Sequence, residues 1–99
     1  MVRKLYRQGD VILEKVMDLS NNNIEMLRCE KVSDRLEIVS EIGHRHLLEA
    51  EVYRGYRTYV VVRKQAMMMH DQHPPVVVEP GIYELRFVRD WLLDARPID

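Results

Sequence analysis

Short runs of β-branched, aromatic and other apolar residues recur along the chain, and polar clusters, glycines and prolines separate them. Such runs predict strands rather than helices, and so does the balance of 13 valines to three alanines. The runs expected to form strands are 11–16, 24–32, 36–39, 44–53, 58–63, 64–70, 76–78 and 82–88. For 64–70 a helix is the competing interpretation.

Turn residues mark the boundaries between these runs. Gln8, Gly9 and Asp10 indicate a turn before the first strand, and the polar stretch 18–23 indicates a loop after it. Gly43 is suited to a bend or bulge, because glycine adopts backbone angles that other residues avoid. Further turns are expected at 54–57 and at 80–81. The tail from residue 90 is expected to form a short helical turn that Pro97 ends.

We therefore expect a mainly β protein, with an α+β fold as the alternative. The arrangement should be a compact single antiparallel sheet or a partly open barrel with at most one short helix. A chain of 99 residues is too short for two cores, so residues 1–99 are expected to form one domain.

Charge and composition narrow the classes of function. Lys and Arg number 15 against 16 for Asp and Glu, so no general positive field attracts phosphate backbones, and nucleic-acid binding is disfavoured. No run of 18 apolar residues is present, so no membrane-spanning helix is expected. The N-terminal segment also lacks the apolar core of a signal peptide. The single cysteine, Cys29, excludes an intramolecular disulfide.

The four histidines are the main candidates for chemistry, and they form two close pairs: His44 with His46, and His70 with His73. On a strand, residues i and i+2 lie on one face with Cα atoms roughly 6.5–7 Å apart, so both imidazoles can reach one ion. His70 and His73 are candidates to complete the ligand set, and zinc or iron is the expected type of metal. The alternative is that all four are structural residues in hydrogen bonds, without any cofactor.

Four motifs in order resemble those of a known family: QGDVIL at 8–13, SEIGHRH at 40–46, HDQHPP at 70–75 and PGIYELRFVRDW at 80–91. The family comprises small uncharacterised proteins of archaeal filamentous and rod-shaped viruses, with relatives in phages and bacteria. The length of 99 residues resembles that of a lipothrixvirus member. The resemblance implies a hot, acidic archaeal setting and a thermostable protein, and it carries no established activity. It also singles out the four histidines as the positions to test.

Two hypotheses of function follow. The first, which we favour at this point, is a viral accessory or interaction protein without catalytic activity. It would act in the host cytoplasm, with virion association as the alternative, and would bind an unknown protein partner. We expect a homo-oligomer, in the form of a dimer, whose β edges and Tyr, Met and Val surface bind a partner. The second hypothesis is a small metal-binding protein or metalloenzyme that uses the four histidines.

Overall fold

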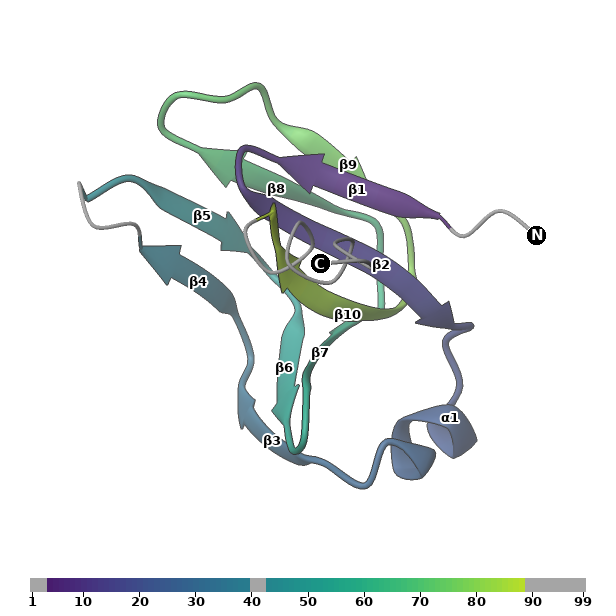
Figure 1. The fold of residues 1–99 in the computed structure, drawn as a ribbon. Coiled ribbons are helices and arrows are strands. Elements are labelled where there is room, and N and C mark those ends of the chain that lie inside the picture. The colour runs from purple at the N-terminus through teal and green to yellow at the C-terminus, as the bar shows by residue number, and fades with distance from the viewer. Residues whose placement is uncertain (1–3, 40–42, 89–99) are drawn as a thin grey trace, which may run out of the picture.

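The computed structural model describes residues 4–39 and 43–88. These residues form short strands and one short helix (Figure 1). In chain order the elements are β1 (Leu5–Gln8), β2 (Val11–Met17), α1 (Asn21–Met26), β3 (Glu30–Ser33), β4 (Leu36–Val39), β5 (Arg45–Leu48), β6 (Glu51–Arg54), β7 (Thr58–Val62), β8 (Ala66–His70), β9 (Val76–Val78) and β10 (Gly81–Phe87). The prediction of a mainly β fold is confirmed.

The strands divide between two antiparallel sheets rather than forming one. The larger sheet has the order β1-β2-β10-β7-β6-β3, and the smaller has the order β4-β5-β8-β9. The chain passes from the smaller sheet to the larger one at Glu49 and Ala50, between β5 and β6 (Figure 1). The expected continuous strand 44–53 is therefore two strands in different sheets, although Leu48, Ala50 and Val52 are all buried as their alternation predicted.

The hydrophobic core lies between the two sheets. The larger sheet contributes Val11, Leu13, Val60, Val62 and Tyr83, and the smaller sheet contributes Leu36, Leu48, Met68 and Val78. Burial of one such aliphatic or aromatic side chain contributes about 1.5–3 kcal/mol relative to its exposure. This shared core holds the two sheets together and sets the relative positions of the turns at their ends.

Two expectations at the N-terminal half of the chain are wrong. The segment 24–32 is not one strand, because α1 occupies Asn21–Met26 and β3 begins only at Glu30. The polar stretch expected to be a loop contains the start of this helix, where the Ser20 hydroxyl accepts a hydrogen bond from the Asn23 amide at 3.0 Å. Serine is a favoured N-cap, and that local bond outweighs the weak helix propensity of asparagine. In addition, β1 was not expected.

Other local expectations are confirmed. Residues 66–70 form a strand and not a helix, with Met68 fully buried and Met67 and Met69 about half exposed. Gly43 has φ +90°, a conformation that favours glycine. The helical turn expected after residue 90 lies outside the described residues. Among residues 4–39 and 43–88, no helix has the length and apolar character needed to cross a membrane.

Candidate functional site

All four histidines meet at one end of the smaller sheet. His46 lies on β5, His44 precedes that strand, His70 ends β8, and His73 lies in the loop before β9. The ring centroid of His70 is 4.2 Å from that of His46, 4.5 Å from that of His73 and 5.8 Å from that of His44. We call these four residues the histidine cluster.

Strand pairing brings the two sequence pairs together. His46 on β5 is the direct cross-strand neighbour of His70 on antiparallel β8. Side chains of directly paired residues lie on the same face of a sheet and contact each other. His44 keeps the face of His46 through the two-residue repeat, so the predicted parity and the register together assemble the cluster.

Gln8, at the end of β1, connects the larger sheet to the cluster. Its side chain is 2% exposed, and its Nε2 donates to the carbonyl oxygens of Met68 and Pro74 at 2.9 and 3.0 Å. Because these two acceptors engage the amide nitrogen, the amide oxygen faces His46 Nδ1 at 3.0 Å. His46 Nδ1 must then carry a proton and donate it, which leaves a lone pair on Nε2 of the neutral ring.

His46 itself is buried, with 3% of its surface exposed. Burial lowers the pKa of His46 from its ordinary value of 6.5, and the neighbouring His70 lowers it further, while the Asp10 carboxylate partly opposes both effects. The ring is therefore neutral at pH 7. A neutral imidazole with a fixed Nδ1 proton and an open Nε2 is the usual state of a histidine that binds a metal or accepts a proton.

The turn between β1 and β2 packs directly against the rings. Gly9 has φ +60°, and a Cβ atom there would lie 2.8 Å from His73 Nε2 and 3.4 Å from His46 Cε1. Only glycine allows both this backbone conformation and this close approach without displacing a ring. The turn thereby places the Asp10 carboxylate 3.6 Å from His46 Nε2.

A second carboxylate lies on the other side of the cluster, where Asp71 Oδ2 is 3.6 Å from His44 Nδ1. The nearby His70 Nδ1 accepts a hydrogen bond from the Gln72 backbone amide at 2.9 Å. In the neutral ring the proton of His70 is then on Nε2, so neither of its nitrogens presents a free lone pair. Ligation by His70 requires this hydrogen bond to break or the proton to leave.

In the described residues the histidine cluster does not form a ready set of metal ligands. Within the part of the chain that the structure describes, no three His, Cys, Asp or Glu side chains are arranged so that they could hold a metal ion. The ring spacing nevertheless suits a shared ion. Two imidazoles bound at 90–110° to one zinc, with Zn–N distances of about 2.0–2.1 Å, have centroids roughly 4.5–5.5 Å apart. The His70–His73 separation of 4.5 Å lies at the lower limit of that range, the His70–His46 separation of 4.2 Å lies just below it, and the His70–His44 separation of 5.8 Å lies just above it.

The sequence pattern indicates all four histidines, but for Gln8, Gly9 and Asp10 it indicates only a turn and not their roles at the cluster. The signal for Gln8 was the QGDVIL motif, in which a polar residue precedes a buried strand. Nothing in the local pattern shows that this glutamine is buried, because its partners Met68 and Pro74 are 60 and 66 residues away in the chain.

The fold and the site together describe a small β protein of two sheets with a histidine cluster at one end of the smaller sheet. The turn between β1 and β2 of the larger sheet packs on this cluster. A family model for a domain of unknown function, DUF8820, matches residues 7–87, and the chain belongs to this family. The match spans every residue of the cluster and the turn that packs on it. No curated protein and no solved structure matches the chain. The family description assigns no activity, and the viral origin implied by the motifs stays a prediction.

Proposed function

We propose that the protein binds a divalent transition-metal ion, such as zinc or ferrous iron, at the histidine cluster. The observation that carries this proposal is the convergence of four imidazoles from two distant segments, in which the ring centroid of His70 lies 4.2–5.8 Å from those of the other three. Structural histidines need no such grouping, since each is satisfied by a carbonyl or carboxylate of its own. Four adjacent imidazoles also repel one another when protonated, a cost that metal binding offsets.

His46 Nε2 is the central ligand in this proposal, because the Gln8 side chain holds the ring and its tautomer in place. His73 is the second ligand, since it is exposed and its Nε2, like the His46 ring, lies against Gly9. His70 and His44 complete the set once the hydrogen bond from Gln72 is released. Imidazole donors favour zinc, copper, nickel and ferrous iron over magnesium or calcium.

The resemblance to small proteins of archaeal viruses supports a role inside the host cell. Metal binding needs unprotonated imidazoles, so such a site loads at the near-neutral pH of a cytoplasm and releases its ion in an acidic medium. The low pKa of His46 favours the ligating form. We propose a binding role and no reaction.

The test is isothermal titration of the purified, chelator-treated protein with zinc and with ferrous iron under anaerobic conditions, together with elemental analysis. The wild-type chain should bind close to one ion. His73→Ala should weaken binding at least about tenfold, because it removes a ligand from an exposed loop. Gly9→Ala should also weaken it, since a Cβ there would lie 2.8 Å from His73 Nε2.

Arg45→Ala is the matched control. Arg45 lies between His44 and His46, its side chain is on the opposite face, and its partner is Glu37 at 3.2 Å. This variant should bind metal like the wild type. Absence of binding by the wild-type chain refutes the proposal, and so does equal affinity in all three variants. Circular dichroism of each variant separates loss of a ligand from loss of the fold.

The outer face of the smaller sheet supports a second candidate function, self-association. Met67 on β8 is paired with Val77 on β9, and these side chains are 48% and 44% exposed. Met69 is 45% exposed and is paired with Leu47 on β5. Adjacent exposed apolar pairs on one sheet face are typical of an interaction surface, and methionine adapts its shape to a partner.

We propose that this face pairs with the same face of a second copy in a homodimer. Sedimentation equilibrium should give a dimer mass for the wild type and a monomer mass for Met67→Lys, in which two copies of the new charge would meet at the interface. Lys64→Glu, an exposed charge change just before β8, serves as the control and should remain a dimer. A monomeric wild-type chain at high concentration refutes this candidate.

A further inference from the structure

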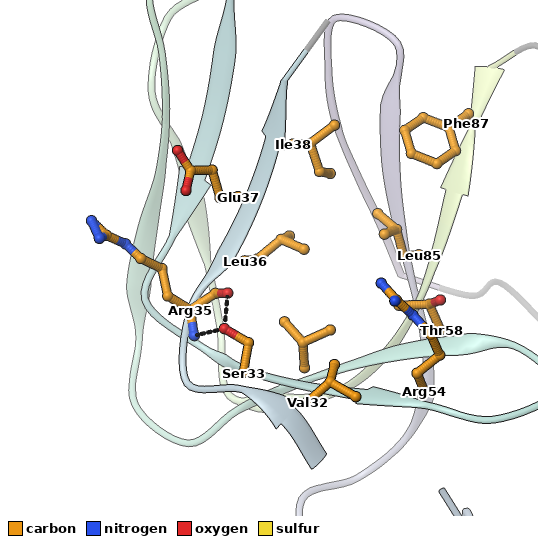
Figure 2. Close-up of a pocket in the computed structure, with 11 residues that line it drawn as sticks. Val32, Ser33, Arg35, Leu36, Glu37, Ile38, Arg54, Thr58, Leu85 and Phe87 are labelled. Carbon is orange, nitrogen blue, oxygen red and sulfur yellow. Dashed lines mark hydrogen bonds between the residues drawn. The ribbon is translucent and has the colours of Figure 1, made fainter. Parts of the chain in front are cut away.

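A pocket lies between the two sheets, lined by residues of β3, β4, β6, β7 and β10 (Figure 2). Its volume is about 530 Å³, which lies within the range of pockets that hold small molecules. The pocket is lined by both sheets, because β3 and β6 belong to the larger sheet and β4, which starts at Leu36 soon after β3 ends at Ser33, belongs to the smaller one.

Apolar side chains form the walls. Leu36 and Ile38 come from β4, and Leu85 and Phe87 come from β10, and Figure 2 shows the four side chains directed toward the same space. Ile38, Leu85 and Phe87 are only partly buried although they pack against the core. An apolar ligand in this space would remove their remaining surface from water, which favours binding.

Arg54 supplies a charge at the edge of this apolar space. It lies at the end of β6, two residues after the buried Val52, and therefore on the inner face of the sheet. Its cross-strand neighbour is Thr58, and Figure 2 shows the Arg54 side chain beside Thr58 at the pocket wall. Both residues line the pocket, so a hydroxyl lies next to the guanidinium.

Arg54 differs from the other charged residues of the pocket in having no partner among the residues that the structure describes. Arg35 pairs with Glu49 at 3.4 Å, and Glu37 pairs with Arg45 at 3.2 Å. Within residues 4–39 and 43–88, Arg54 makes no ion pair and no side-chain hydrogen bond, although Glu30 is its neighbour on β3. The five donors of its guanidinium are thus available to an anion, and a carboxylate fits them in a bidentate manner.

We infer that this pocket binds a small apolar carboxylate, with the apolar body between β4 and β10 and the carboxylate on Arg54. The walls match the apolar part of such a molecule, and the unpaired guanidinium beside Thr58 matches its charge. The inference is independent of the histidine cluster. The pocket adjoins the cluster, because the pocket residue Ile38 is the cross-strand neighbour of His46, but the inference rests on no residue of the cluster.

The experiment is an NMR titration of the full ¹⁵N-labelled chain with decanoate, and separately with decanol as the uncharged analogue, both below their aggregation limits. Decanoate should shift the amides of Leu36, Ile38, Leu85 and Phe87 and should bind more tightly than decanol. Arg54→Gln should weaken decanoate binding at least about fivefold and leave decanol binding unchanged. Lys64→Gln removes one positive charge outside this pocket and should behave like the wild type.

Three results would overturn the inference. The first is the absence of decanoate-induced shifts in the pocket residues. The second is equal affinity for decanoate and decanol, or equal affinity of wild type and Arg54→Gln for decanoate, because the guanidinium then recognises nothing. The third is a shift of the same amides on dilution without ligand, because a second copy of the chain then covers the pocket. Arg54 is exposed, so its replacement leaves the fold intact.

Discussion

Replacement of Gln8 by methionine should destabilise the protein far more than an ordinary glutamine substitution. Gln8 joins the larger sheet to the histidine cluster by three hydrogen bonds: to the Met68 carbonyl at 2.9 Å, to the Pro74 carbonyl at 3.0 Å and to His46 Nδ1 at 3.0 Å. Methionine has nearly the same length and volume but makes none of these bonds. The change therefore removes hydrogen bonds and leaves the packing nearly unchanged.

The expected magnitude follows from burial. The bonds to Met68 and His46 are buried, whereas the bond to Pro74 is only partly so, and water can replace it. A buried polar group that loses its partner costs about 1–3 kcal/mol. Two such groups together lower the free energy of unfolding by roughly 3 kcal/mol. This figure allows for the proton of His46 moving from Nδ1 to Nε2, where it faces Asp10 and part of the cost is recovered. For a chain of this size each kcal/mol lowers the melting temperature by about 4–8 °C, so the loss is roughly 12–24 °C.

The assay is urea and thermal unfolding of the chelator-treated protein at pH 7, followed by circular dichroism. Gln65→Met is the matched control. Gln65 is exposed, and its hydrogen bond to Glu79 at 2.7 Å is open to water, so its loss should cost less than about 0.5 kcal/mol. If the free energies of unfolding of the two variants differ by less than about 1 kcal/mol, the reasoning about Gln8 is refuted, because burial of the hydrogen bonds then makes no difference to the cost of losing them.

Two further predictions concern other parts of the larger sheet. Gly55→Ala should lower the free energy of unfolding by about 1–3 kcal/mol, because its Cβ would lie 2.6 Å from Cys29 Sγ. Adding Cys29→Ala to this variant should restore most of that stability. If urea unfolding shows that the two substitutions destabilise additively, the prediction is wrong. The Arg63 guanidinium holds the pKa of Glu51 below its ordinary 4.5, so this pair stabilises the fold above pH 4.5 and the contribution is lost as pH falls below that value. The urea midpoint of Glu51→Gln should therefore fall less steeply below pH 4.5 than that of the wild type; parallel curves for Glu51→Gln and wild type would disprove the assignment.

Much of the secondary structure was predictable because its cause is local. Alternation along residues 44–52 predicted which side chains are buried, and Pro80 and Gly81 marked the start of the last strand. The wrong prediction at 24–32 also has a local cause. Ser20 is the N-cap of α1, and its hydroxyl accepts a hydrogen bond from the Asn23 amide, which favours a helix over a loop at the three asparagines. The division into two sheets depends on which strands pair across long stretches of chain, and one sequence carries little trace of such pairing.

The sequence by itself determined the chemical inventory of the site: two histidine pairs, each short enough to act as one unit, and the i and i+2 spacing that puts His44 and His46 on one face. Only the tertiary structure decided that the two pairs meet, through the cross-strand pairing of His46 with His70. Only the tertiary structure shows that Gln8, which the sequence places in a turn motif, is a buried side chain that holds His46 in place. The physical reason is that spacing along a strand follows from covalent geometry, whereas burial and contact between distant segments follow from the packing of the whole chain.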